Sequence, residues 1–229
     1  PCPAVTSTVI VTVNPIPTVN AIPNQTVCEV SPTTAVTLSS PVIGTTFSWS
    51  GTSANGITNF PLSGATSSIP SFTPNNPNAT AGTITYTITP SASGCVGTPI
   101  TFNYTVNPAP NITAIPPQTV CSNQQTTAVS FSSNVANTTY SWSSSVVGSV
   151  TGNTINGTGN IPAQTLINSG TTNGTATYSV TPTANGCPGA PTNFVVTVYP
   201  VPDVNPIAPQ TICSGGQTTS VTLSSPVGG

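Results

Sequence analysis

Six cysteines are the residues of this sequence whose type and spacing carry the clearest chemistry. They are separated by 26, 67, 26, 66 and 26 residues, at Cys2, Cys28, Cys95, Cys121, Cys187 and Cys213. Cysteines form disulfides in oxidising compartments and bind zinc when closely spaced. No two of these cysteines have zinc-ligand spacing, so we expect no metal site. Their even number and regular spacing predict disulfides and an oxidising compartment.

Acid–base chemistry is almost excluded by composition. The chain has no Lys, Arg or His, and its only acidic residues are Glu29 and Asp203, 174 positions apart (203 minus 29). General acid–base catalysis needs a group that titrates near neutral pH, and a Ser or Thr nucleophile is inert without an adjacent base. We therefore predict that the chain is not an enzyme and holds no cofactor.

Partners that are recognised through positive charge are excluded in the same way. Nucleic acids and anionic membrane surfaces attract Lys and Arg, and the chain has neither. No apolar run approaches the roughly 20 residues that cross a bilayer. Two isolated acids also make a strong calcium site unfavourable. We predict no nucleic-acid partner and no membrane insertion in this segment.

The cysteines mark an internal repeat of domain size. Every second cysteine recurs after 92 or 93 residues, within the related motifs NQTVCEV, PQTVCSN and PQTICSG, or SGCVGTP and NGCPGAP. We expect the chain to start and end inside a repeat and to be part of a longer protein. The predicted organisation is a last strand of a preceding repeat (1–14), two complete repeats (15–107 and 108–199) and the first strands of a following, incomplete repeat (200–229).

Alternation of apolar and polar residues predicts short β-strands throughout. Phe102, Tyr104 and Val106 alternate before a Pro-x-Pro segment, and the 26 Pro and 19 Gly are hostile to long helices. In the second repeat the expected strands include Gln118–Cys121, Ala128–Ser132 and Tyr140–Ser143. The fold predicted is all-β: tandem immunoglobulin-like antiparallel β-sandwiches in a linear array.

Four aromatic residues are predicted to fill the cores of the two repeats. Trp49 and Trp142 each lie twenty-one residues after a cysteine, and Tyr86 and Tyr178 occupy equivalent later strands. A Trp on the third strand of a sandwich buries a large area between the sheets. The alternative is a surface Trp that stacks on a sugar. We favour the core, because an aromatic two residues earlier fits the same alternation.

Two arrangements of the disulfides agree with the repeat. Pairing across the 26-residue gap, as in Cys95–Cys121, has to bridge a final strand, a Pro-rich linker and the next first strand, which separates the sulfurs by tens of ångströms. Pairing across the longer gap stays within one repeat and is favoured, with roughly 4 kcal/mol of stabilisation per bond. The predicted pairs are Cys28–Cys95 and Cys121–Cys187, with Cys2 and Cys213 paired to cysteines outside this sequence.

The order QTVC, SW, IP, TYSVTPTANGC and VTVYPVP resembles the PKD-like immunoglobulin-type repeats of giant secreted surface proteins of Bacteroidetes-type bacteria, among them gliding adhesins. The resemblance covers both complete and both partial repeats. It implies a secreted, cell-surface or filamentous location and an adhesive or spacer role. It carries over no catalytic or ligand residues. The near absence of acids departs from many relatives and speaks against rigidification by calcium.

The predicted function is that of a structural and adhesive repeat region in an extracellular stalk or filament, with Pro-x-Pro segments as stiff linkers. The expected partners are neighbouring repeats of the same chain, like copies in a filament or bundle, and an unidentified surface ligand. The alternatives are a carbohydrate- or host-surface-binding module, a spacer of a large secreted enzyme, and a polymer of short subunits that exchange strands.

Overall fold

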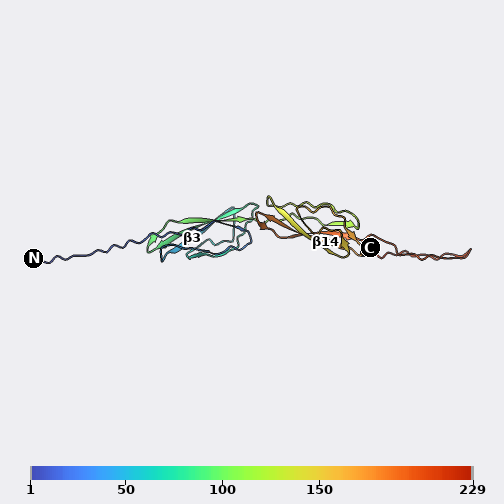
Figure 1. Ribbon diagram of the computed structural model, residues 1–229, viewed down its shortest axis with the longest axis horizontal. Helices are drawn as coiled ribbons and strands as arrows, with labels where there is room; N and C mark the ends of the chain where they lie inside the picture. Colours follow the sequence, from blue (N-terminus) through green and yellow to red (C-terminus); the bar gives the residue numbers. More distant parts are fainter. Residues whose placement is uncertain (1, 228–229) are drawn as a thin grey trace. The chain divides into compact units, whose positions relative to one another are not determined.

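The computed structural model describes residues 2–227, and every helix or strand assigned among them is a β-strand. The chain divides into two units, Pro1–Pro108 and Ala109–Gly229, which hold repeat 1 and repeat 2. Figure 1 marks β3 in repeat 1 and β14 in repeat 2. Pro1 and residues 228–229, at the outer limits of the predicted partial repeats, lie outside the described residues.

Repeat 1 is built on one large sheet with the strand order β1-β8-β6-β3-β4. A short strand, β7, pairs with β6, and β2 and β5 form a separate two-stranded sheet. The strands are β1 (Gln25–Cys28), β2 (Val36–Thr37), β3 (Thr46–Ala54), β4 (Ser63–Gly64), β5 (Ser68–Ile69), β6 (Gly82–Ala92), β7 (Cys95–Val96) and β8 (Ile100–Asn107).

Repeat 2 has the corresponding sheet, in the order β12-β10-β14-β16-β9, with β15 paired to β14 and a two-stranded sheet of β11 and β13. Its strands are β9 (Gln118–Cys121), β10 (Thr139–Val147), β11 (Val150–Thr151), β12 (Asn156–Thr158), β13 (Ile167–Asn168), β14 (Gly174–Ala184), β15 (Cys187–Pro188) and β16 (Thr192–Tyr199). Both repeats are immunoglobulin-like β-sandwiches, as the sequence predicts.

The central strand of each sheet follows the expected alternation. Burial alternates strictly along β6 and along β14, with every second side chain facing the core. Ile84, Tyr86 and Ile88 of β6 are fully buried and pack against Val36 and Ile69 of the small sheet. Burying such side chains contributes about 1.5–3 kcal/mol each. The period-2 pattern therefore defines the face of the sheet that closes the sandwich.

The first strand of each repeat pairs in parallel with the last strand. Cys28 at the end of β1 lies opposite Asn107 at the end of β8, and Cys121 lies opposite Tyr199 in repeat 2. Because the two strands run in the same direction, both end at the same end of the sandwich. The cysteine of the first strand is therefore placed where the chain leaves the repeat.

One strand prediction differs from the structure. The segment predicted as a strand at Ala128–Ser132 makes only a single bridge, between Val129 and Ile161. A strand forms only when a neighbour pairs its backbone groups. No strand is assigned in the described residues of 1–14 and 200–229, and their place in neighbouring repeats, which would supply the pairing strands, remains a prediction.

Candidate functional site

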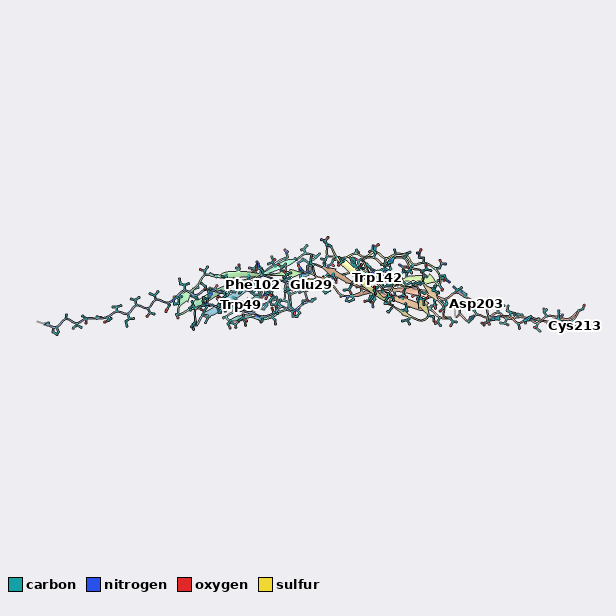
Figure 2. All side chains as sticks on the ribbon, in the orientation of Figure 1. Glu29, Trp49, Phe102, Trp142, Asp203 and Cys213 are labelled. Atoms are coloured by element: carbon teal, nitrogen blue, oxygen red, sulfur yellow. The ribbon has the colours of Figure 1, made fainter. Side chains whose placement is uncertain are left out.

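The four predicted core aromatics lie in the cores. Trp49 and Trp142 are each 5% exposed, and Tyr86 and Tyr178 are almost fully buried. In both repeats the Trp and Tyr rings meet edge to face with their centroids 5.9 Å apart, a favoured aromatic geometry. Figure 2 labels Trp49, Phe102 and Trp142 within the bodies of their repeats. These side chains support the fold and are not open platforms for a sugar.

A glycine covers the tryptophan in each repeat. A Cβ atom on Gly64 would lie 2.3 Å from Cζ2 of Trp49, and one on Gly157 would lie 2.3 Å from Cζ2 of Trp142. Both glycines sit on the edge strand that pairs with the strand of the Trp. Any larger residue would displace the indole, so the divergent loops that contain these glycines are constrained at this point.

A buried asparagine that sequence reasoning missed ties the small sheet to the last strand. In repeat 2 the Asn168 amide donates to the carbonyl oxygens of Thr172 (2.8 Å) and Val198 (2.9 Å), and its Oδ1 accepts from the Gly170 N–H (2.9 Å). In repeat 1 Asn76 donates to the corresponding carbonyls of Thr80 and Val106. The two asparagines lie 92 positions apart, the length of one repeat, and this equivalence in the sequence could have identified them.

Burial raises the pKa of the core tyrosines. Desolvation raises the pKa of Tyr86, with an added contribution from nearby Tyr104, and it raises the pKa of Tyr178 against a smaller opposing effect of a hydrogen bond with Gln164. The Tyr178 hydroxyl donates to Oε1 of Gln164 at 2.9 Å. The folded state therefore holds these phenolic protons more tightly than the unfolded chain does.

We expect the repeats to lose stability in alkali for this reason. The tyrosine contribution is fully present below about pH 10, the unfolded pKa, and is lost as the pH rises above it, because only the unfolded chain then releases the protons easily. Urea unfolding at pH 8 and pH 11 measures the loss. In Tyr178→Phe the loss in repeat 2, followed by Trp142 fluorescence in a Trp49→Phe background, should be smaller. An unchanged loss would assign it to other groups.

The two cysteines of repeat 1 lie at opposite ends of the sandwich. Cys95 pairs with Ala92 at the turn between β6 and β7, whereas Cys28 is level with Asn107, next to the pair of Val106 and Gly82. The eleven residues of β6 separate these ends, a distance of about 30 Å at 3.3 Å per residue. A disulfide requires Cα atoms about 4.4–6.8 Å apart. These two cysteines cannot be joined within the folded repeat.

Repeat 2 has the same arrangement. Cys187 follows a two-residue turn in which Asn185 and Gly186 have φ angles of 51° and 77°, and it pairs with Ala184 at one end of β14. Cys121 is level with Tyr199, beyond the other end of β14, where Val198 pairs with Gly174. Positive φ at both turn residues is the geometry of a tight type I′ hairpin. The hairpin therefore presents its cysteine at a fixed place.

The favoured intradomain disulfides are thus corrected by the structure. Cys95 and Cys121 are free thiols, so the predicted pairs Cys28–Cys95 and Cys121–Cys187 are not formed, and neither is the alternative pair Cys95–Cys121. Cys28 and Cys187 are disulfide-bonded. The physical reason is the parallel pairing of first and last strands, which sends the two cysteines of a repeat to opposite ends. Cys2 and Cys213 are free, and their partners outside this sequence remain a prediction.

Comparison with protein-family models shows to which family the chain belongs. The model of the PKD-like domain matches residues 25–110 and again residues 118–202, together well over half of the sequence. The chain belongs to the PKD-like domain family. Both matches begin at the first residue of the parallel edge strand, Gln25 of β1 and Gln118 of β9. No curated protein matches the sequence.

Three solved structures illustrate what these PKD-like repeats are similar to. DIP-gamma IG1+IG2 has 11% identity, a TM-score of 0.38 and coverage of 80% of this chain and 98% of that chain. Sidekick-1 immunoglobulin domains 1–5 have 14% identity, a TM-score of 0.38 and coverage of 82% and 39%. Human CDH23 EC21-23 has 14% identity, a TM-score of 0.37 and coverage of 93% and 81%. Identities of this size concern the fold alone.

The charged residues of the PKD-like repeats have structural partners. The Glu29 carboxylate accepts a hydrogen bond from the Asn76 N–H at 3.1 Å, and the Asp203 carboxylate accepts one from the Val204 N–H at 2.8 Å. Across residues 2–227 no three His, Cys, Asp or Glu side chains gather as metal ligands. Within the same residues no helix has the length and apolar character to cross a membrane.

Proposed function

We propose that this chain is a segment of the structural and adhesive repeat region of an extracellular protein, which forms a long stalk or filament. The observation that carries the proposal is that equivalent residues have the same structural role in both repeats. The Trp under a Gly, the core Tyr, the buried Asn and a cysteine at each end recur in both. Repetition of a whole sandwich without a repeated acid–base group is typical of a spacer.

An extracellular, cell-surface location is supported by the disulfide form of Cys28 and Cys187. Disulfides persist in oxidising environments and are rare in the cytosol. The absence of Lys and Arg also leaves trypsin-like proteases no cleavage site, which suits a protein exposed outside the cell. The sequence resemblance points to a secreted adhesin of Bacteroidetes-type bacteria as its source. In this function the chain itself has no catalytic activity.

The linkers of the proposed stalk are the Pro-x-Pro segments. Pro108 and Pro110 follow repeat 1, and Pro200 and Pro202 follow repeat 2. Proline-rich linkers favour extended polyproline II geometry and act as semi-rigid spacers. A sandwich with strands of ten or so residues and a short linker gives an expected rise of about 45 Å per repeat. Neighbouring repeats, and like copies in a bundle, are the partners in this arrangement.

Adhesion is assigned to the edge strands and loops that differ most between the repeats, residues 51–68 and 144–160. These segments expose large apolar side chains at different positions, Leu62 in repeat 1 and Val147 and Ile155 in repeat 2. Loops on a rigid scaffold carry binding in many sandwich proteins. The core Trp and Tyr recur in both repeats, whereas most residues of these segments differ. A ligand that distinguishes the repeats would therefore bind these segments.

Imaging of native material tests this function. Antibodies raised against the 229-residue chain should label intact cells of the source organism without permeabilisation, and released material should show filaments with an axial repeat of about 45 Å. An in-frame deletion of one repeat in the native gene should shorten the filaments and leave the labelling in place. Label that appears only after permeabilisation, or surface material without filaments, would contradict the proposal.

A further inference from the structure

The cysteines at the ends of the repeats suggest a linkage that goes beyond the proposed function and does not depend on it. Cys28 lies opposite Asn107, the last residue of β8, in the parallel ladder. The Glu29 N–H also donates to the Asn107 carbonyl at 2.9 Å. The chain therefore leaves repeat 1 directly beside its first-strand cysteine.

The chain enters repeat 2 beside the hairpin cysteine. Gly189, two residues after Cys187, packs so closely on Pro110 that a Cβ atom on it would lie 1.8 Å from the Pro110 carbonyl oxygen. In repeat 1 the corresponding Gly97 packs on Pro17 in the same way, with 1.9 Å for the same contact. The glycines let the entering chain run against the β-hairpin that carries the cysteine.

One contact in repeat 1 shows how the incoming residues meet this hairpin. The Asn14 side-chain amide donates to the carbonyl oxygen of Ser93, in the turn just before Cys95, at 3.1 Å. In the repeat register Asn14 corresponds to Asn107, since VTVNP and YTVNP align with a shift of 93 residues. Asn107 is the residue opposite Cys28. From this equivalence we expect the exit of one repeat to lie beside the hairpin of the next.

The linker between these two points is too short to separate them. Three residues lead from Asn107 to Pro110, which is at most about 10 Å of extended chain. Within a single repeat, by contrast, the two cysteines are about 30 Å apart. Cys95 and Cys121 mark the far ends of repeat 1 and repeat 2, respectively. Cys28 therefore lies beside one end of the segment from Asn107 to Pro110, and the hairpin of Cys187 lies beside the other end.

We propose that a disulfide joins the first-strand cysteine of each repeat to the hairpin cysteine of the following repeat, here Cys28 to Cys187. This rule accounts for the oxidation states. Of the six cysteines, only Cys28 and Cys187 have their partner within this sequence, and they are the two in disulfide form. The rule assigns the other four to repeats outside the sequence, and they are free: Cys2, Cys95, Cys121 and Cys213.

The bond forms by thiol–disulfide exchange with an external disulfide, such as glutathione disulfide. One cysteine thiolate attacks the external disulfide, forms a mixed disulfide and releases a first thiol. The second cysteine thiolate then displaces the other thiol. Two cysteine thiols lose two electrons and two protons in total, and the external disulfide is reduced to two thiols.

The mechanical consequence is a limit on how far the chain can lengthen. Between one interdomain disulfide and the next, the covalent path is the 26-residue segment from a hairpin cysteine to the next first-strand cysteine. Fully extended, this segment spans at most about 90 Å. An array joined in this way could lengthen under load only until these segments are straight.

Peptide mapping of the oxidised 229-residue chain tests the pairing. The chain is equilibrated in glutathione redox buffer, its free thiols are alkylated, and it is digested with pepsin, since trypsin has no site. The expected product is a Cys28 peptide linked to a Cys187 peptide, with the other four cysteines alkylated. A Cys28–Cys95 or Cys121–Cys187 link, or alkylation of all six cysteines, would overturn the proposal.

Two-cysteine variants give the matched control. One variant keeps Cys28 and Cys187, the other keeps Cys121 and Cys187, and Ser replaces the remaining four cysteines in each. Both retain the buried Cys187 and both tryptophans, whose fluorescence reports folding. In the same redox buffer the first variant should form an intramolecular disulfide at least tenfold more completely than the second. Equal closure, or preferential closure of the second variant, would reject the interdomain rule.

Discussion

Replacing Trp142 by Ala is expected to unfold repeat 2 at much lower urea concentration and to leave repeat 1 folded. The substitution removes a buried indole that packs on Tyr178 and under Gly157. Truncation of a core Trp costs roughly 3–5 kcal/mol, a large part of the 5–15 kcal/mol that stabilises a typical domain. The remaining Trp49 fluorescence reports repeat 1, and chymotrypsin susceptibility reports repeat 2.

The control lies on the same strand as Trp142. Val147→Ala changes an exposed side chain of β10, and we expect it to alter the free energy of unfolding by less than about 0.5 kcal/mol. The two repeats have separate core clusters, so the Trp49 transition should not move in Trp142→Ala. A shift of the Trp49 transition as large as the loss in repeat 2 would show that the cores unfold together.

Replacing Asn168 by Ala is expected to destabilise repeat 2 by about 3 kcal/mol. The amide of Asn168 donates to the part-buried carbonyl of Thr172 and the buried carbonyl of Val198, and it accepts from the Gly170 N–H; a buried polar group left without a partner costs about 1–3 kcal/mol. Urea unfolding of Asn168→Ala in a Trp49→Phe background, where Trp142 is the remaining tryptophan, measures the change. The same substitution in a Trp142→Phe background reports repeat 1 through Trp49 and serves as the reference.

Two further variants separate hydrogen bonding from side-chain removal. Asn168→Asp keeps the acceptor for the Gly170 N–H but cannot donate to the carbonyls of Thr172 and Val198, so at pH 7 it should be at least as destabilising as Ala. Asn156→Ala, at an exposed position of β12, should change stability by less than about 0.5 kcal/mol. A stable Asn168→Ala variant would show that the small sheet does not depend on this contact.

The composition, the repeat and the alternation were sufficient to predict the architecture. Period-2 alternation specified the buried face of β8, where Phe102, Tyr104 and Val106 face the core, and the equivalent positions of Trp49 and Trp142 identified the cores. These predictions succeed because they depend on local spacing, which the chain shows directly. The polar members of the core were missed. Gln164, which takes the place of Phe72 in repeat 2, is buried, and its Oε1 accepts hydrogen bonds from the Tyr178 hydroxyl and the Thr154 N–H.

The cysteine pairing shows the limit of reasoning from spacing. A 67-residue separation within one repeat looks like an intradomain bond, and the 26-residue path between neighbouring repeats is expected to hold its cysteines tens of ångströms apart. In the structure the intradomain pair does not form either, because β1 runs parallel to β8 and carries Cys28 to the end of the sandwich away from Cys95. Sequence spacing does not distinguish a parallel edge strand from an antiparallel one, and only that direction determines which end of the sandwich carries Cys28.

The sequence by itself determined that this is an all-β chain of repeated sandwiches with Trp and Tyr cores, since alternation, proline content and internal repetition are properties of the linear chain. Only the tertiary structure decided where the chemistry lies. Strand direction, the tight turn before Cys187 and the packing of Gly189 on Pro110 bring together residues far apart in sequence. Such contacts depend on the paths of several strands at once, which no local pattern specifies.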